Sequence, residues 1–543
     1  MIEQADEGFK AAEAAWNALK ADRTEHEQDW QDIARLIRTQ RGGFSSADPA
    51  LHRDDKPLDN SALIASANFA SGLYGTLTNP TSRWFSFTTS DEDLAAWQPM
   101  KIWLDTVTKR VFRSLAPAVS PFYGQVIQAK ADIAAFGNAC FASTRAPGSR
   151  EIVDEAISLA EVACDIDSFG RVREVARRFR ISPVAAAERF GRDTLPPKLM
   201  EMVDKGARER VDFLHHVYPR PAGERGKRWV SVYASVIGKA TVQRGGYDEM
   251  PIHYPRWEVD TGQTYGRGPG WIALPAARKA ELMSQANLRA GQYAADPTLL
   301  AAGADDWDYG GRVVPGGIVY GGLDTRGNQM LRPLNTTFAT GLSEAQQQQA
   351  VEAIRDAFHW TLMNLAGRSG MSATEVVERA EERLRLMAPH LGRVQEELLS
   401  PVVSRRFSIL WRAGQLPPPP AEASGADLAL DYTSAAAMAQ RSAEGAATVR
   451  LIEDVGRLAE VDPSIADRFD ADAALDVLQE ARGAPARLVR SPDQARELRE
   501  ARAQAEAEAA QPQEMLEALT AGGAAAREIA GAAGALQQLE TAR

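Results

Sequence analysis

Residues 343–416 have the sequence SEAQQQQAVEAIRDAFHWTLMNLAGRSGMSATEVVERAEERLRLMAPHLGRVQEELLSPVVSRRFSILWRAGQL, which predicts two helices joined by a short glycine turn. In the first part, apolar residues recur every three or four positions, the period of one helix face. At about 1.5 Å per residue, a helix over 343–365 would be a rod of roughly 35 Å. Two glycines within four residues then favour a turn at 366–371, because glycine adopts positive φ freely. The apolar stripe consists of Val351, Ile354, Phe358, Leu362 and Leu365.

The second helix of this stretch is predicted over 372–416. Ser372 and Glu375 fit a capping box, in which the Ser side chain bonds an orphan amide and the Glu three residues later reaches back. Pro389 and Pro401 lie inside the predicted helix and should kink or interrupt it. Four prolines at 417–420 end it. A long rod, a glycine-arginine tip and a bent return helix are typical of a structural element rather than of an enzyme's centre.

Arg368 is the basic residue of the glycine turn, and two interpretations of it stay open. It is either a solvated cation interacting with the dipole of a helix carboxyl end, or the tip of a loop that touches phosphate weakly and reversibly. The residues assigned to this turn are Gly367, Arg368, Ser369 and Gly370.

Length and composition set broad limits. The chain has 543 residues, 44% hydrophobic and 25% charged, as in a folded soluble protein of several domains. Its formal net charge of −11 argues against tight wrapping of nucleic acid, which needs a basic face. Two cysteines, Cys140 and Cys164, are too few for a disulfide framework and fit a reducing cytosol. The polar amino terminus predicts no signal peptide, and no apolar run reaches membrane-spanning length.

Residues 1–272 are predicted to mix helices with a β meander. Apolar periodicity of helical type is followed by shorter, alternating patterns, and glycines at 245–246 suggest a turn at 245–247. The residues Tyr265, Gly266, Arg267 and Pro269 form a hinge before the next helix. Helices are expected over 8–39, 60–77, 97–115, 121–136, 182–191 and 196–207, and strands over 84–87, 160–183, 212–218 and 229–237.

A helix is predicted over 273–295, followed by a change of composition over 296–342. Glycine, proline and short apolar pairs there indicate a small β-rich insert. Because the insert lies between two predicted helices, the simplest arrangement is an antiparallel helix pair with the insert at its far end. The last part, 421–543, is rich in alanine and holds two aromatic residues, Tyr432 and Phe469. Such a segment buries little apolar surface per residue, so we expect it to be stabilised by neighbouring segments or by other copies of itself.

The sequence carries no recognisable motif of a catalytic, nucleotide-binding or metal site. No glycine-rich loop carries the Lys and hydroxyl of a phosphate-binding motif, so no ATPase activity and no cofactor are expected. His215 and His216 are adjacent and would point to opposite faces of a strand, which excludes a shared metal ion. We expect the seven histidines to be structural and predict neither a catalytic nor a metal site.

One segment suggests an alternative function. The residues ISPVAAAERFG at 181–191 follow several arginines and have the pattern of the first helix and turn of a helix-turn-helix. This would make the chain a DNA-binding regulator using residues 173–191. Against it, prolines at 196–197 delay the next helix, where Glu201 and Asp204 add negative charge. A hydrolase with unrecognised carboxylates is a third possibility, for which the sequence offers no constellation.

Several short motifs, taken in order, resemble the portal, or head-to-tail connector, family of tailed phages, in particular its short-tailed branch. The resemblance covers roughly residues 23–420. At Asn138 the chain departs from the family's Gly-Thr-Ala type step. The motifs are LTNPTSRWF at 77–85, FGNA at 136–139, PRW at 255–257, YGRGP at 265–269, SATEV at 372–376 and GQLP at 414–417.

The resemblance implies an α+β, predominantly helical fold with a wing, a helical stem, a small β-rich clip and a helical crown or barrel, assembled as a ring. It assigns 1–272 to the wing, 273–295 and 343–365 to the stem helices, and 296–342 to the clip. Residues 366–371 would be the tunnel loop facing DNA, 372–416 the kinked helix back to the wing, and 421–543 the crown, ending in a low-complexity tail that is helical or disordered. The clip residues expected to dock partners are Arg312, Val313, Val314, Ile318 and Tyr320.

The resemblance also implies a function and its partners. The ring, usually of about twelve subunits, would sit at one capsid vertex of the virion after assembly in the bacterial cytoplasm. Double-stranded DNA would enter through it, driven by a separate terminase ATPase, and leave the same way. Tail adaptor proteins, capsid protein and scaffolding protein are the other expected partners, with no membrane and no enzymatic activity.

Overall fold

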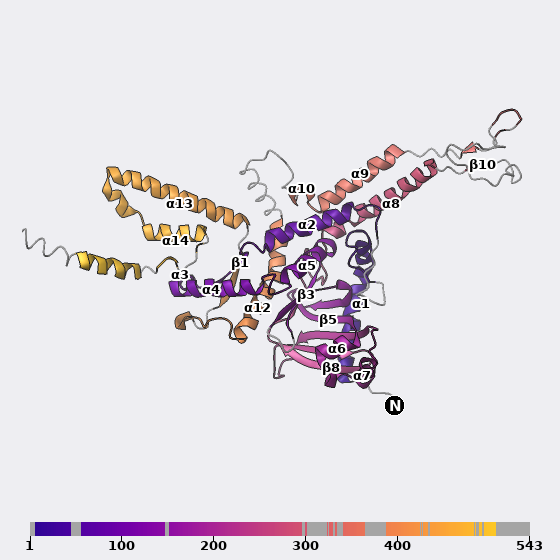
Figure 1. Ribbon diagram of the computed structural model, residues 1–543, viewed down its shortest axis with the longest axis horizontal. Helices are drawn as coiled ribbons and strands as arrows, with labels where there is room; N and C mark the ends of the chain where they lie inside the picture. The colour runs from indigo at the N-terminus through magenta and orange to yellow at the C-terminus, as the bar shows by residue number, and fades with distance from the viewer. Residues whose placement is uncertain are drawn as a thin grey trace, which may run out of the picture. The chain divides into compact units, whose positions relative to one another are not determined.

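The computed structural model describes residues 6–44, 56–146, 151–295, 340–363, 387–423, 427–432, 435–482 and 494–506, with short pieces between them at 299–300, 323, 325–328, 332–333, 425, 484 and 488–490. Two compact units are present. The first comprises Met1–Ser86, Val107–Pro417 and Tyr432–Ala436, and the second Phe87–Thr106, Pro418–Asp431 and Ala437–Arg543. Figure 1 follows the chain through both. The fold is mixed α and β and rich in helix, as expected.

A five-stranded antiparallel sheet forms much of the first unit, with its strands in chain order. The predicted meander is therefore confirmed. The predicted turn at 245–247 is wrong, because these residues continue the last strand and pair with residues 229–231. The strands are β4 (Val162–Ile166), β5 (Val172–Ile181), β6 (Val211–Pro219), β7 (Trp229–Ser235) and β8 (Ala240–Tyr247).

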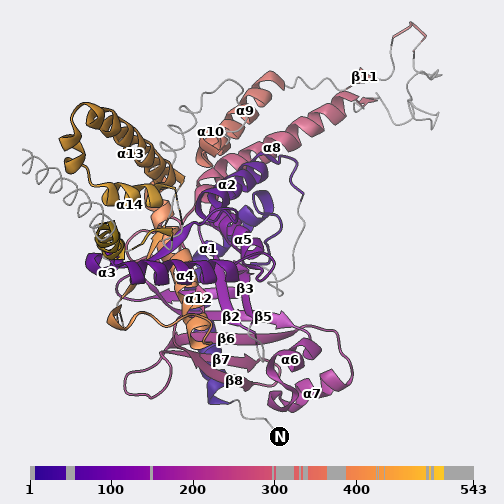
Figure 2. The ribbon, with the colours of Figure 1, turned by 60° about the vertical axis from the view of Figure 1, so that its left-hand side comes forward.

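Helices cover both faces of this sheet, as its alternating side chains require. Helix α1 (Glu7–Leu36) packs Phe9 and Trp16 against one face. Helices α6 (Pro183–Phe190) and α7 (Pro197–Asp204) lie over the other, around Phe213; Figure 2 shows them beside the strands.

The helix-turn-helix interpretation of 173–191 is wrong. Most of the arginine-rich part is β5, a strand with neighbours on both sides, and Ala186 of α6 is fully buried against the sheet. Arg178 pairs with Asp212 at 2.7 Å, and Arg177 pairs with Glu155 and Glu161 at 2.9 and 2.8 Å. The segment is therefore part of a packed core and presents no recognition helix.

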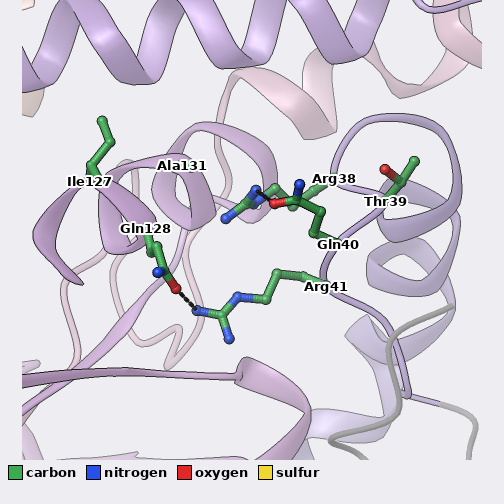
Figure 3. Close-up of a pocket in the computed structure, with 7 residues that line it drawn as sticks. All are labelled: Arg38, Thr39, Gln40, Arg41, Ile127, Gln128 and Ala131. Atoms are coloured by element: carbon green, nitrogen blue, oxygen red, sulfur yellow. Dashed lines mark hydrogen bonds between the residues drawn. The ribbon is translucent and has the colours of Figure 1, made fainter. Parts of the chain in front are cut away.

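A smaller sheet joins β3 (Ile152–Ile157), β2 (Cys140–Arg145) and β9 (Ile252–His253). Helices α2 (Ser61–Leu77) and α5 (Phe122–Phe136) pack against each other beside it. Lys130 of α5 is fully buried and donates to Thr78 Oγ1 at 2.6 Å and to the Leu73 carbonyl at 3.2 Å, both at the carboxyl end of α2. Burial lowers the pKa of Lys130 well below its usual value. A cavity of about 710 Å³ lies between residues 38–41 and α5 (Figure 3).

The predicted antiparallel helix pair is present as α8 (Pro269–Ala295) and α9 (Thr340–Ala357). Ser343 and Gln347 of α9 bond Asn287 and Ser284 of α8, so the chain directions are opposed. Among the few described residues of the insert, β10 (Leu299–Leu300) pairs with β11 (Arg332–Pro333).

The second helix of the pair does not run unbroken to residue 365, contrary to the prediction. It ends at Ala357, and His359 has a φ of +48°, a left-handed conformation that ends a helix. A short helix, α10 (Trp360–Met363), follows. The apolar stripe continues across this break, since Phe358 is fully buried, which explains why periodicity alone did not reveal it.

The return helix is described from residue 387 onward, and the predicted irregularity at Pro401 is confirmed. Residues 387–394 are helical, Gln395–Leu399 form a π-helical turn, and α12 (Ser400–Arg412) follows. Pro401 has no amide hydrogen and so cannot donate to the carbonyl of residue 397 as an α-helix requires. A wider turn just before the proline accommodates this loss.

The remaining elements are mostly short. Helix α5 is preceded by α3 (Glu92–Ala96) and α4 (Gln98–Ser114). Strand β1 (Phe85–Thr89) pairs with β12 (Leu428–Tyr432). Beyond them lie α13 (Ala435–Val461) and α14 (Ala471–Ala481), with several apolar side chains exposed, among them Leu451, Leu458 and Val461. No helix in the described ranges is both long and apolar enough to cross a membrane.

Candidate functional site

The predicted site residues divide into two groups. The tunnel-loop residues Gly367, Arg368, Ser369 and Gly370, the cap residues Ser372 and Glu375, and the clip residues Arg312, Val313, Val314, Ile318 and Tyr320 lie outside the described residues. The hinge residues Tyr265, Gly266, Arg267 and Pro269 are described. They lie within the first compact unit, just before and at the start of α8, and this junction of α8 with α5 and the return helix is the candidate site.

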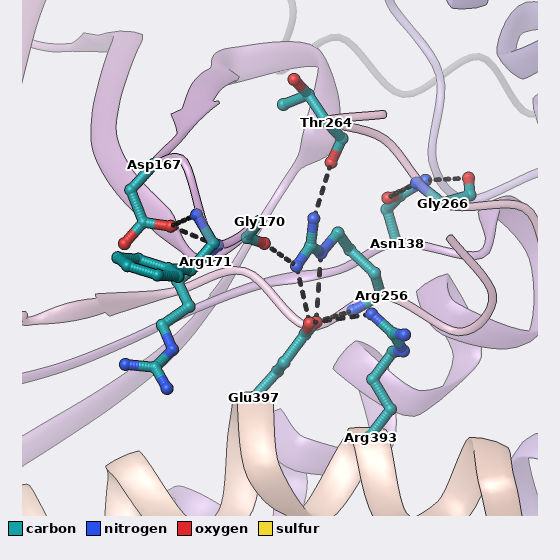
Figure 4. Close-up of polar contacts among 10 residues, drawn as sticks. Asn138, Asp167, Gly170, Arg171, Arg256, Thr264, Gly266, Arg393 and Glu397 are labelled. Atoms are coloured by element: carbon teal, nitrogen blue, oxygen red, sulfur yellow. Dashed lines mark hydrogen bonds and ion pairs between the residues drawn. The ribbon is translucent and has the colours of Figure 1, made fainter. Parts of the chain in front are cut away.

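The hinge backbone is clamped by the side chain of Asn138. Asn138 Oδ1 accepts from the amide of Gly266 at 2.7 Å, and Asn138 Nδ2 donates to the Gly266 carbonyl at 2.7 Å. Both ends of one carboxamide therefore bind one residue of the hinge, as Figure 4 shows. A threonine hydroxyl carries its donor and its acceptor on a single oxygen, so it does not offer the two separate atoms with which the carboxamide meets the amide and the carbonyl of Gly266. The departure at Asn138 thus has a structural role.

Glycines allow the start of α8 to lie directly on the end of α5. A Cβ at Gly268 would come within 2.6 Å of Gly137 Cα, and one at Gly270 within 2.1 Å of the Ala135 carbonyl oxygen. Gly137 itself has a φ of +75° and ends α5. The close backbone contact therefore requires glycine at each of these positions.

Tyr265 anchors the hinge to the interior. Its ring packs against Trp30, with centroids 5.5 Å apart, and against His26 at 5.3 Å. Its hydroxyl accepts from the Cys164 amide at 3.3 Å, and burial raises the pKa of Tyr265. Burial also lowers the pKa of His26 and raises that of Cys164 to about 12. Both cysteines are free.

Arg256 links three segments at the junction. Its guanidinium donates to Glu397 Oε1 at 2.7 Å and Oε2 at 3.2 Å, to the Gly170 carbonyl at 2.7 Å, and to the Thr264 carbonyl at 3.4 Å. Its backbone amide also donates to Glu397, at 2.8 Å. Glu397 lies in the π-helical turn, Gly170 in the β4–β5 turn and Thr264 in the hinge (Figure 4). One side chain, 3% exposed, therefore ties the return helix and the hinge to the large sheet.

Aromatic rings reinforce this attachment. Trp257 stacks on His390 of the return helix at 4.7 Å and meets Phe69 of α2 edge-on at 5.4 Å. Phe69 in turn contacts Phe358, at the break after α9, at 6.1 Å. The chain on either side of residues 364–386 is thus fixed to the same aromatic cluster.

A second anchor lies further along the return helix. Arg406 pairs with Asp154, and both side chains are fully buried. Asp154 also accepts from the hydroxyls of Ser120 and Ser143. Neighbouring Arg405 donates to the Ser143 carbonyl at 2.6 Å and lies over the ring of Tyr247. The helix is therefore held along its length by buried arginines.

The contacts of the junction hold segments of the first compact unit together. Within the described ranges, no group of three His, Cys, Asp or Glu side chains is placed to bind a metal ion. His215 stacks on Tyr233 and His216 bonds Glu174, so these two histidines each have a structural contact, as expected for them.

Sequence reasoning found part of this junction. The hinge and the PRW motif at 255–257 were identified, but Glu397 was missed. Its partner Arg256 is 141 residues away in the sequence, and a glutamate on an exposed-looking helix carries no signal of such a pairing. The one local sign was the proline at 401, four residues on, which marks the irregular turn.

Residues 10–489 match the family model described as "Bacteriophage head to tail connecting protein". The chain belongs to this family, whose members are structural connectors and not enzymes. It is 29% identical to the "Probable portal protein" of Bordetella phage BPP-1 over 506 residues, covering 90% of each chain. It is also 28% identical to the "Portal protein" of Salmonella phage epsilon15 over 559 residues, covering 96% of this chain and 97% of the relative.

Among solved structures, the chain is similar to one in "Neck of empty GTA particle computed with C6 symmetry", with a TM-score of 0.36, 14% identity and coverage of 82% of this chain and 93% of that chain. The family match and the two relatives do not favour the DNA-binding regulator. The expected identity as a portal, or head-to-tail connector, of a phage virion is confirmed by the family match and the two relatives.

Proposed function

We propose that copies of this chain form a ring at one vertex of the capsid, through which DNA is packaged by a separate terminase and later ejected. The proposal rests on family membership and on one structural observation. Helix α8 leaves the junction with large apolar side chains exposed along it. Exposed apolar area of this kind marks a surface that a partner covers, and in a ring that partner is the next copy. These side chains are Ile272, Leu282, Leu288 and Tyr293, which are 51–60% exposed.

In this proposal α8 and α9 form the stem and residues 296–342 the clip. The clip residues Arg312, Val313, Val314, Ile318 and Tyr320 dock the terminase during packaging and tail adaptors afterwards. Residues 366–371 form the tunnel loop, and residues 421–543 the crown. Assembly takes place in the host cytoplasm with scaffolding and capsid protein.

The charge of the chain supports passage rather than capture of DNA. A channel lined with many lysines and arginines would release counterions from DNA and hold it tightly. A formal charge of −11 avoids this. The junction supports the same role, since Arg256 and Arg406 fix the return helix to other segments of the first compact unit. A ring that transmits force between its stem and its wing needs such fixed attachments.

The location of the protein tests the proposal directly. A tagged chain incorporated into particles and labelled with an electron-dense reagent should appear at one vertex per particle, in both empty and filled heads. Label spread over all vertices, or over the whole shell, would refute the portal role. Particles assembled with untagged chain serve as the control for non-specific label.

A further inference from the structure

The cavity between the end of α1 and α5 is lined by two arginines and lies outside the junction described above. Arg38 and Arg41 enter it from the segment after α1, and Gln128 faces them from α5 (Figure 3). The cavity measures about 710 Å³, and none of its described lining residues is acidic. Two arginines against the one carboxylate of Asp132, which contacts both, leave these described residues with a net positive charge, in a chain whose formal charge is −11.

Within the described residues, both guanidiniums contact the carboxylate of Asp132. Arg38 Nε lies 3.3 Å from Asp132 Oδ1, and Arg41 Nη2 lies 3.3 Å from Asp132 Oδ2. The Asp132 side chain is 1% exposed and those of Arg38 and Arg41 are 17% and 12% exposed. The nearby carboxylate of Glu155 is engaged by Arg177 at 2.9 and 3.3 Å.

The contacts that the described residues make with these two arginines are all long. Arg38 donates to Gln40 at 3.2 Å, and Arg41 donates to Gln128 at 3.4 Å and to the Ala156 carbonyl at 3.2 Å. Charge-assisted hydrogen bonds are normally about 2.7–2.9 Å, the distance at which Arg256 meets Glu397 Oε1. Asp132 Oδ2 has no hydrogen bond of good geometry within the described residues. The guanidiniums are thus positioned without being saturated.

We propose that this cavity binds a phosphate group. A carboxylate has two oxygens, which one guanidinium can satisfy in bidentate fashion. Two guanidiniums, with the amide of Gln128 and the hydroxyl of Thr39 in the same lining, match the larger set of oxygens on a tetrahedral anion. The cavity is also large enough for a phosphate that carries a substituent. The site is independent of the proposed ring and of the tunnel loop.

Inorganic phosphate is the first probe, added to the full-length chain at constant ionic strength with chloride as the balancing anion. Binding to the folded state should raise the unfolding temperature with the logarithm of the phosphate concentration once this exceeds the dissociation constant, by roughly 2–4 °C near ten times that constant. Phosphate also stabilises proteins non-specifically through exclusion from their surface. That part rises linearly with phosphate concentration and is the same in all variants, so the logarithmic part is the readout.

Arg38→Gln and Arg41→Gln should each remove the logarithmic rise. Arg35→Gln is the matched control, since Arg35 lies one turn earlier on α1 with its side chain 61% exposed. An equal logarithmic rise in the wild type and in the Arg38→Gln/Arg41→Gln double variant would overturn the proposal. So would an equal effect of acetate, which would indicate a carboxylate site.

Equilibrium dialysis of the wild type against radiolabelled phosphate needs no variant and guards against misfolding of the arginine mutants. Saturable uptake supports the site, and its absence overturns it. Competition then identifies the source of the phosphate group. Displacement by a mononucleotide but not by duplex DNA indicates a small ligand. Displacement by duplex DNA at equal phosphate concentration indicates the DNA backbone.

Discussion

Arg256 and Glu397, 141 residues apart, bind each other through the side chain and the backbone amide of the arginine, with distances of 2.7–3.2 Å. The pair joins a π-helical turn of the return helix to the hinge that precedes α8. It also reaches the β4–β5 turn through the Gly170 carbonyl. The three segments therefore cannot move independently without breaking a mostly buried ion pair.

Glu397→Ala should destabilise the first compact unit by about 3 kcal/mol, because it leaves the buried Arg256 without its carboxylate. Chemical denaturation followed by tryptophan fluorescence measures the loss. Glu396→Ala is the matched control, since Glu396 is the exposed neighbour on the same turn. Equal effects of the two substitutions would show that the pair has no special role.

Gly270→Ala should destabilise the protein by about 1–3 kcal/mol, the usual cost of overpacking, because its Cβ would lie 2.1 Å from the Ala135 carbonyl oxygen. Gly291 lies in the same helix with nothing within 4 Å of its Cβ position. Gly291→Ala should therefore stabilise α8 by about 0.5–1 kcal/mol. Thermal unfolding of both variants compares them, and a Gly270→Ala protein as stable as Gly291→Ala would contradict the close contact of α8 with α5.

Arg406→Met should cost about 3–5 kcal/mol, because it leaves Asp154 charged and buried. Adding Asp154→Leu should recover part of this loss, since the double variant buries no unpaired charge. The serine hydroxyls of Ser120 and Ser143 would still lack their acceptor, so recovery should be incomplete. A double-mutant cycle gives the coupling, and strictly additive losses would refute the pairing.

Stability should fall in mild acid because of His253. Burial and the nearby Arg405 lower the pKa of His253 to about 3, so the folded protein keeps this side chain neutral. The unfolded chain, with an ordinary pKa of about 6.5, binds a proton below that pH. The free energy of unfolding should therefore be unaffected by this group above about pH 6.5 and decrease by up to about 1.4 kcal/mol per pH unit below it.

Denaturation curves between pH 7 and pH 4.5 for the wild type and His253→Phe separate this contribution from other titrating groups. The variant should show the shallower loss. Parallel pH profiles would mean that His253 accepts a proton in the folded state.

Arg368→Ala tests the interpretation of the glycine turn as a DNA-facing loop. Ring assembly should be intact, because the substitution adds no bulk, while the amount of packaged DNA per particle should fall. Particle density and nuclease-protected DNA measure this. Normal filling of the variant particles would defeat the idea that Arg368 grips DNA and would favour its role at a helix end.

Local periodicity was sufficient to predict most of the elements. Phe213 and Tyr233 lie in the core on one face of the large sheet, and their neighbours Leu214 and Ala234 lie in the core on the other face. Apolar residues at successive strand positions thus indicate a sheet covered on both faces. The antiparallel α8–α9 pair followed from the position of the insert. The turn predicted at Gly245 and Gly246 was wrong, because glycine within a strand can also allow two backbones to approach closely. A Cβ at Gly246 would lie 2.5 Å from the Trp229 carbonyl oxygen.

The contacts that hold the junction together could not be predicted in this way. The break at His359 leaves the apolar stripe intact, so helical periodicity continues through a non-helical residue. Arg256, Arg405 and Arg406 look like surface cations in the sequence, yet each is at most 3% exposed. Their carboxylate partners are distant in the chain, and such tertiary pairings leave no local pattern.

The native mass of the purified full-length chain, measured together with negative-stain images, tests the central claim most directly. We predict a ring of about a dozen subunits with a central hole, formed by the chain alone or on addition of scaffolding protein. A monomer or dimer that persists with scaffolding protein present would contradict the ring and with it the proposed channel.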